Sequence, residues 1–240
     1  MKAHIPNFIT CLNLLCGCIA IVLIFNDQMD YAAILITGSL AFDFLDGFAA
    51  RRLNAGSKIG RELDSLADVV SFGFVPGLIG CQLCLSSPPV SLEPGLWIHQ
   101  VIGYFPLVIT IASAIRLARF NVDSRQTDSF IGVPTPAITI LMLGLALIVE
   151  HDRFSLTPTI LNPFFICGLT MVIAWLLNSE LPMIALKFKT FSPSENRFQY
   201  ALIALSAASL SLLGIAGIPL TIVLYILVSV LKSPKNPNII

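Results

Sequence analysis

The sequence contains few charged residues and no excess of either sign. Only 12% of its 240 residues are charged, as 14 basic and 14 acidic side chains, whereas soluble domains typically carry about 25%. The zero net charge leaves no basic face for nucleic acid, so we expect no nucleic-acid partner. Hydrophobic residues make up 56% of the chain, and its mean hydropathy is +0.86. The composition therefore predicts an integral membrane protein.

The cysteines also lack the arrangement of a disulfide framework or a zinc site. All six lie in apolar runs, where we expect them to be small buried hydrophobic residues: Cys11, Cys16, Cys18, Cys81, Cys84 and Cys167. Cys81-x-x-Cys84 has the spacing of a redox or metal pair but lacks a second pair of ligands. No small-residue cleavage site follows the first apolar run, which is long enough to span a membrane.

Eight apolar segments are candidates for transmembrane helices, each of which takes about 20 residues. They cover approximately residues 5–25, 31–53, 62–85, 97–120, 134–150, 160–181, 198–213 and 216–232. With the N-terminus in the cytoplasm, every basic residue except Arg153 falls on the cytoplasmic side, as basic loop residues usually do. The sequence predicts an all-α, polytopic membrane helical bundle of about eight transmembrane helices, with both termini cytoplasmic.

Four aspartates interrupt the apolar pattern in two neighbouring helices, where a carboxylate is costly. Asp43 and Asp46 share one face of the second helix, and Asp64 and Asp68 share one face of the third. The short basic loop between these helices makes them antiparallel neighbours, so the four carboxylates can converge just inside the cytoplasmic leaflet. Converging carboxylates need protons or cations, and hard oxygen ligands favour Mg²⁺, Mn²⁺ or Ca²⁺ over Zn²⁺.

Small residues beside the aspartates leave space along both helices. Gly47, Ala50, Gly56 and Gly60 would clear a groove, and Arg51 next to it can neutralise a phosphate. Because Mg²⁺ and Mn²⁺ commonly bind together with substrate phosphates, the combination predicts a diphosphate site. The alternative is structural: small residues allow close helix packing, and intramembrane aspartates can pair with arginines.

The full pattern has eight fixed positions in residues 43–68, Asp43-x2-Asp46-Gly47-x2-Ala50-Arg51-x8-Gly60-x3-Asp64-x3-Asp68. It resembles the signature of the CDP-alcohol phosphatidyltransferase family, whose members join a CDP-activated lipid to an alcohol and release CMP. The resemblance implies one or two Mg²⁺ or Mn²⁺ ions, held by Asp43, Asp46, Asp64 and Asp68. It also implies that Asp68 is the general base. The implied CDP-diacylglycerol-binding residues are Pro6, Asn7, Thr10, Gly47, Ala50, Arg51 and Gly60.

Further segments resemble the branch of this family that uses L-serine as the acceptor and makes phosphatidylserine. They are IPNFITCLN at 5–13, SFGFVP at 71–76, AIRLARFN at 114–121 and FIGVPTPA at 130–137. Arg116 and Arg119 lie on one helical face and could bind the serine carboxylate bidentately, with Ser71 and Asn121 as further polar contacts. Alternatively, the two arginines only anchor the helix end at the membrane surface. The acceptor also stays open, because inositol or glycerol phosphate acceptors would require arginines as well.

The resemblance is good over residues 5–140 and weak beyond them. We expect one membrane domain, 1–240, with a catalytic core of six helices at 1–185 and two additional helices at 198–232. The resemblance suggests a homodimer in the inner membrane of a prokaryote, with the active site facing the cytoplasm. The rival functions are phosphatidylglycerophosphate synthesis and divalent-cation transport. Transporter sites usually lie near the bilayer midplane in related repeats, and the second half has no matching acidic pair.

Overall fold

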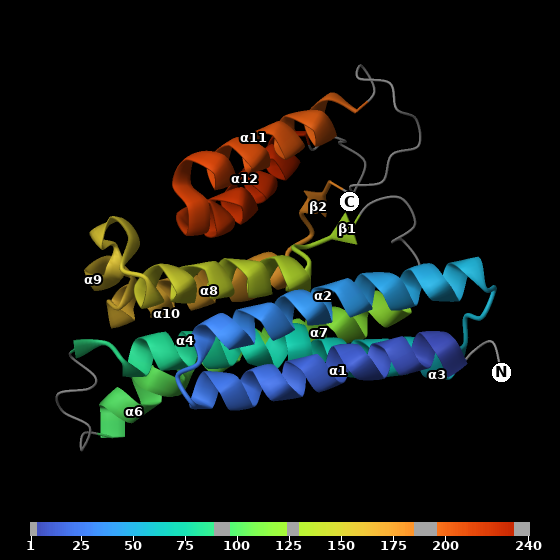
Figure 1. Ribbon diagram of the computed structural model, residues 1–240, viewed down its shortest axis with the longest axis horizontal. Helices are drawn as coiled ribbons and strands as arrows, with labels where there is room; N and C mark the ends of the chain where they lie inside the picture. Colours follow the sequence, from blue (N-terminus) through green and yellow to red (C-terminus); the bar gives the residue numbers. More distant parts are fainter. Residues whose placement is uncertain (1–3, 89–96, 124–129, 185–195, 233–240) are drawn as a thin grey trace.

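The computed structural model describes residues 4–88, 97–123, 130–184 and 196–232, and it is largely helical (Figure 1). The first half contains α1 (His4–Phe25), α2 (Met29–Arg52), α3 (Lys58–Asp68), α4 (Val75–Leu85), α6 (Trp97–Tyr104) and α7 (Val108–Val122). The second half contains α8 (Thr135–Glu150), α9 (Thr157–Ile160), α10 (Pro163–Asn178), α11 (Arg197–Leu213) and α12 (Gly217–Lys232). Within the described residues, the only strands are β1 (Phe130–Ile131) and β2 (Pro182–Met183), which pair antiparallel.

The helices have the length and surface of membrane-spanning elements. Five segments of the described chain are long and apolar enough to cross a membrane: His4–Phe25, Met29–Arg52, Lys58–Leu85, Gln100–Val122 and Arg197–Leu231. Two shorter apolar helices, α8 and α10, accompany them. Large apolar side chains such as Phe8, Ile34 and Trp175 are more than half exposed, which suits helices surrounded by lipid. The predicted class, an α-helical membrane protein, is therefore confirmed.

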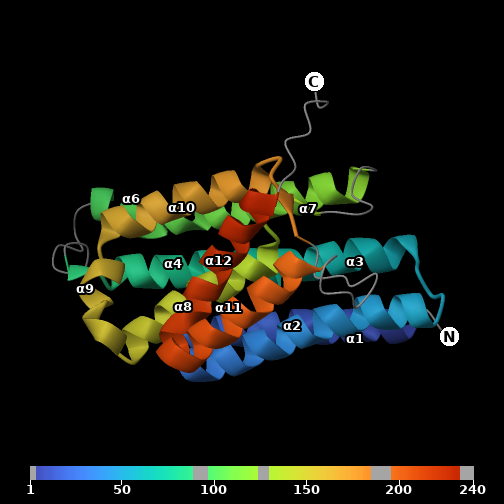
Figure 2. The ribbon, with the colours of Figure 1, turned by 90° about the horizontal axis from the view of Figure 1, so that it is seen from above.

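The helical segments run back and forth along the long axis of the molecule (Figure 1). Helix α1 packs along α2 and α3, while α4, α7, α8 and α10 surround an apolar core. Ile79, Ile109, Ile138 and Ile173, one from each of these four helices, have no exposed surface. Helices α11 and α12 form a hairpin that packs against α8, as the view from above also shows (Figure 2).

The third segment starts at Lys58, slightly earlier than predicted, and changes its helical type in its middle. A π-helical stretch, Val69–Phe74, joins α3 to α4. Neighbouring helices supply extra donors to this stretch: Thr139 Oγ1 donates to the Phe72 carbonyl at 3.3 Å, and Thr110 Oγ1 donates to the Gly73 carbonyl at 3.1 Å. Irregular backbone in an apolar interior requires such partners. They fix the segment directly after the last aspartate of the motif.

The cysteines differ in how deeply they are buried. Cys81 and Cys84 are buried as expected, but the expectation is wrong for Cys11 and Cys18, which are exposed on α1. An apolar run in a membrane helix has a lipid-facing side as well as a buried side, so its apolar character did not separate exposed from buried cysteines.

Several basic residues used to orient the chain lie outside the described residues, namely Lys2, Arg125, Lys187, Lys189 and Lys235.

Candidate metal and substrate site

Three carboxylates of the motif, one from α2 and two from α3, meet in space. One oxygen of each of Asp43, Asp64 and Asp68 lies within 4.8 Å of the other two. Asp68 is only 9% exposed, and the other two are partly buried. The short connection at 53–57 makes the helices antiparallel, which brings acids near the end of α2 opposite acids on α3. The predicted convergence is therefore present for these three aspartates.

The carboxylate cluster has the chemistry of a divalent-cation site. Three carboxylates this close repel one another in a site of low dielectric constant, and a cation offsets that repulsion. Asp64 Oδ1 is buried and has no hydrogen-bond partner among the described residues, so it is available as a ligand. Oxygen ligands of this kind suit Mg²⁺, Mn²⁺ or Ca²⁺. The residues thus fit the metal that the sequence predicts.

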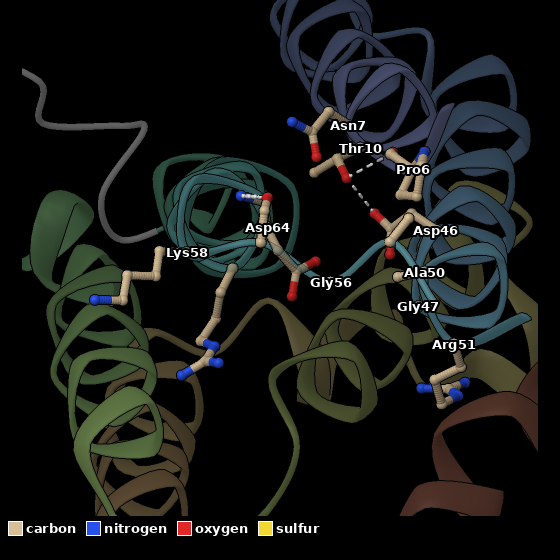
Figure 3. A pocket seen from close by; sticks show the side chains of 14 residues that line it. Pro6, Asn7, Thr10, Asp46, Gly47, Ala50, Arg51, Gly56, Lys58 and Asp64 are labelled. Carbon is tan, nitrogen blue, oxygen red and sulfur yellow. Dashed lines mark hydrogen bonds between the residues drawn. The ribbon is translucent and has the colours of Figure 1, made fainter. Parts of the chain in front are cut away.

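The fourth aspartate, Asp46, lies beside the cluster and is held separately. Thr10 Oγ1 on α1 donates a hydrogen bond of 2.7 Å to Asp46 Oδ2, and Asp46 is 5% exposed (Figure 3). Its carboxylate still interacts electrostatically with Asp43 and Asp64. The motif therefore divides into a cluster of three carboxylates and a fourth carboxylate on the wall of the neighbouring cavity.

A cavity of about 550 Å³ opens beside the carboxylates, between α1, α2 and the start of α3 (Figure 3). It is lined by all seven residues predicted to bind the CDP-lipid: Pro6, Asn7, Thr10, Gly47, Ala50, Arg51 and Gly60. Asp46, Asp64 and Gly56 line it as well. The structure leaves no room for a side chain at Gly60, because a Cβ atom added there would lie 2.9 Å from Asn7 Oδ1. The structure thus brings the small residues of the motif together around one space.

Three polar residues that line the cavity were not assigned to the site from the sequence. Ser57, Lys58 and Arg61 border the cavity at the N-terminal end of α3. Ser57 caps that helix, because its Oγ accepts a hydrogen bond of 2.9 Å from the Gly60 amide. The positive charges of Lys58 and Arg61 and the N-terminal end of α3 favour binding of an anion in this part of the cavity. Their position in the sequence, directly around Gly60, is the signal that could have identified them.

Asn13 connects Asp68 to α1 and α2, a role that the sequence did not reveal. Asn13 is fully buried, and its Nδ2 donates to Asp68 Oδ1 at 3.3 Å. Ser39 Oγ donates to Asn13 Oδ1, which fixes the orientation of the amide. Ser71 Oγ donates to the Asn13 carbonyl at 3.3 Å. A polar amide within an apolar run, one turn after Thr10, was the available signal.

The predicted acceptor residues separate into two pairs. Arg116, 8% exposed, and Arg119 line a small cavity of about 60 Å³ at the end of α7. Arg116 also interacts electrostatically with Asp68. Ser71 and Asn121 are not among the residues that line this cavity. Ser71 binds α1 instead, and Asn121 Nδ2 donates to Ser65 Oγ at 2.9 Å.

This chain is similar to proteins named CDP-diacylglycerol–serine O-phosphatidyltransferase. It is 34% identical to the CDP-diacylglycerol–serine O-phosphatidyltransferase of Bacillus subtilis over 168 residues, which cover 70% of this chain and 84% of the relative. It is 31% identical to the enzyme of the same name from Mycobacterium leprae over 216 residues, covering 87% and 67%. A relative of that name from the archaeon Methanocaldococcus jannaschii is 33% identical over 146 residues, covering 61% and 62%.

A family model described as CDP-alcohol phosphatidyltransferase matches residues 3–185, which contain the carboxylate cluster and both cavities. This match covers well over half of the chain. The match to this family agrees with the spacing of the aspartates in the sequence and with the convergence of their carboxylates in the structure. The chain belongs to the CDP-alcohol phosphatidyltransferase family.

Proposed function

We propose that this protein transfers the phosphatidyl group of CDP-diacylglycerol to the hydroxyl group of L-serine and releases CMP. The observation that carries the proposal is the cluster of Asp43, Asp64 and Asp68 at the edge of a 550 Å³ cavity bordered by glycines and basic side chains. That combination suits a diphosphate with a divalent cation. Serine is the acceptor named for the relatives from bacteria and an archaeon.

In the reaction, the serine oxygen forms a bond to the phosphatidyl phosphorus, and the bond from that phosphorus to the CMP oxygen breaks. A serine hydroxyl is a poor nucleophile, so a carboxylate must take its proton. Asp68 is the candidate base, since it accepts a hydrogen bond from Asn13 and interacts electrostatically with Arg116, the proposed serine-binding residue. A divalent cation bound at the cluster would neutralise charge on the diphosphate and on the departing CMP.

The large cavity would hold the CDP group. Gly47, Ala50 and Gly60 leave room for the nucleotide and diphosphate, and Arg51 supplies positive charge at the rim. Arg51 also interacts electrostatically with Asp46, which precedes it on the same helix. Pro6, Asn7 and Thr10 on α1 form a further part of the wall, next to Asp46 (Figure 3).

The small cavity would hold the serine carboxylate through Arg116, with Arg119 at its exposed side. A guanidinium group matches a carboxylate with two parallel hydrogen bonds. Asp46 would join the cluster as a ligand for one or two ions, with Mg²⁺ or Mn²⁺ as the physiological metal. Ser71 and Asn121 would then support the site indirectly, through Asn13 and Ser65.

We also infer eight transmembrane segments with both termini in the cytoplasm, in the inner membrane of a prokaryote. The start of α1 lies at the same end of the molecule as the connection between α2 and α3, which is flanked by Arg51, Arg52 and Lys58, and this supports a cytoplasmic active site (Figure 1). Residues 1–185 would form the catalytic core and 198–232 an added hairpin. The functional unit would be a homodimer.

The direct test is identification of the lipid product. Purified protein supplied with CDP-diacylglycerol, L-serine and Mn²⁺ should form phosphatidylserine and CMP in equal amounts, as measured by mass spectrometry and nucleotide chromatography. Formation of CMP together with phosphatidic acid, with no serine-containing lipid, would show hydrolysis instead of transfer and would refute the proposal.

A further inference from the structure

The small cavity beside Arg116 is bordered by the ends of two helices that are distant in sequence. Arg116 and Arg119 come from α7, while Asn178 and Glu180 come from the end of α10 and the residues after it. Asp123, just after α7, also borders the cavity. Two basic and two acidic side chains therefore surround it, a charge balance that fits a zwitterion better than a phosphate.

Two buried polar atoms on the cavity-lining side chains lack hydrogen-bond partners within the described part of the chain. They are Arg116 Nε, a donor, and Asn178 Oδ1, an acceptor. The orientation of the Asn178 amide is determined, because its Nδ2 donates to the Ala112 carbonyl at 3.0 Å and to the Ala174 carbonyl at 3.3 Å. Buried polar groups nearly always have partners, so an orphaned donor and an orphaned acceptor at one cavity indicate a ligand with both functions.

We propose that Asn178 binds the ammonium group of the acceptor while Arg116 binds its carboxylate, so that together they select an α-amino acid. This inference rests on the proposed function and specifies how its acceptor is chosen. Arg116 also interacts electrostatically with Asp68, so an amino acid held by Arg116 would lie near the proposed base. Glu180 and Asp123 add negative charge, which attracts an ammonium group and repels a phosphate group.

The test separates recognition of the ammonium group from general damage to the site. L-Alanine keeps both charges of serine but has no hydroxyl, and propionate keeps only the carboxylate. Both are used as competitive inhibitors of serine-dependent CMP release. In Asn178→Leu, the KM for serine and the Ki for L-alanine should each rise about tenfold or more, as expected for one lost hydrogen bond to a charged group. The Ki for propionate and the KM for CDP-diacylglycerol should stay unchanged.

Two further variants complete the design. Asn178→Asp keeps an acceptor oxygen and should recover the serine KM, although it loses the amide donor. Arg116→Ala should weaken serine, L-alanine and propionate alike. Unchanged L-alanine inhibition in Asn178→Leu, or an equal loss for propionate, would overturn the inference while leaving the transferase function intact. A wild-type protein that releases no CMP with serine would refute the proposed function, and this inference with it.

Discussion

Asp68 differs from the other motif aspartates in its contacts. It receives a hydrogen bond from Asn13 and interacts electrostatically with Arg116, whereas Asp46 accepts a hydrogen bond from Thr10 and borders the 550 Å³ cavity. These contacts suit a carboxylate that faces the acceptor more than one that faces the nucleotide. The roles proposed for the aspartates therefore follow from the different side chains around each of them.

The role of Asp68 as base can be tested without removing its shape. Asp68→Asn should lower turnover by roughly 10²–10⁴, the usual contribution of a general base. Binding of CDP-diacylglycerol should persist, because Asp43, Asp46 and Asp64 remain. Glu62→Gln, an exposed acid on the same helix, is the control and should be as active as wild type. Turnover of Asp68→Asn within a factor of two of wild type would rule out the assignment.

Two glycines of the large cavity form a matched pair. A Cβ atom at Gly60 would press on Asn7 Oδ1, at 2.9 Å, and on Ser57 Oγ, at 3.1 Å, whereas one at Gly56 would meet nothing within 4 Å. Gly60→Ala should therefore raise the KM for CDP-diacylglycerol several-fold by displacing Asn7, and Gly56→Ala should have little effect. Steady-state kinetics at saturating serine measures both. Equal KM values in the two variants would contradict this account of the cavity.

At the residue scale, the sequence predicted what helical periodicity controls. Spacings of three and four residues place Asp43 near Asp64 and Asp68 once α2 and α3 are antiparallel. Periodicity along one helix could not show that Asp46 is held by a side chain of α1. It also could not show that Ser71 turns toward Asn13, because that depends on how separate helices pack.

At the scale of elements, the π-helical stretch Val69–Phe74 places the acidic helix α3 in line with the buried helix α4. Pi-helical turns within α-helices frequently occur at functional sites. In the sequence, SFGFVP at 71–76 stands out only through its family resemblance, because its apolar composition is compatible with a regular helix. The donors that satisfy its carbonyls come from α7 and α8, which sequence patterns did not connect to it.

Removing one of these donors should destabilise the protein. In Thr110→Val, the Gly73 carbonyl loses its side-chain donor, and the loss of one intramolecular hydrogen bond typically costs about 0.5–1.5 kcal/mol. Thr37→Val is the control, since the Thr37 hydroxyl only donates to the Ala33 carbonyl within α2 at an exposed position. Thermal unfolding in detergent should show a lower Tm for Thr110→Val than for Thr37→Val. The reverse order would argue against this function of Thr110.

The hairpin of α11 and α12 has contacts that no sequence motif indicated. Tyr225 Oη donates to the Ile184 carbonyl at 3.2 Å, and the Ile184 amide donates to Ser229 Oγ at 3.2 Å. Tyr225 also interacts electrostatically with Arg116. Helix α12 therefore reaches the segment after α10 and the vicinity of Arg116, although it lies outside the residues matched by the family model.

At the scale of the whole molecule, composition and hydropathy predicted the membrane class because burial in lipid affects every helix. The orientation remains a prediction that labelling can test. In a cysteine-free background, a single cysteine at Lys58 should react with a membrane-impermeant thiol reagent only from the cytoplasmic side. Cysteines at Asp27 or Asp152, at exposed helix connections, should react only from outside. Labelling of Lys58 and Asp27 positions from the same side would break the proposed topology.

The most direct measurement of the central claim is CMP release from CDP-diacylglycerol by the purified protein with a panel of acceptors, with and without chelator. We predict that L-serine supports faster release than glycerol 3-phosphate or inositol phosphate. EDTA should abolish release, Mg²⁺ or Mn²⁺ should restore it, and Asp64→Asn should not be restored because it lacks a charged ligand. Faster release with glycerol 3-phosphate than with serine, or full activity in EDTA, would contradict the account.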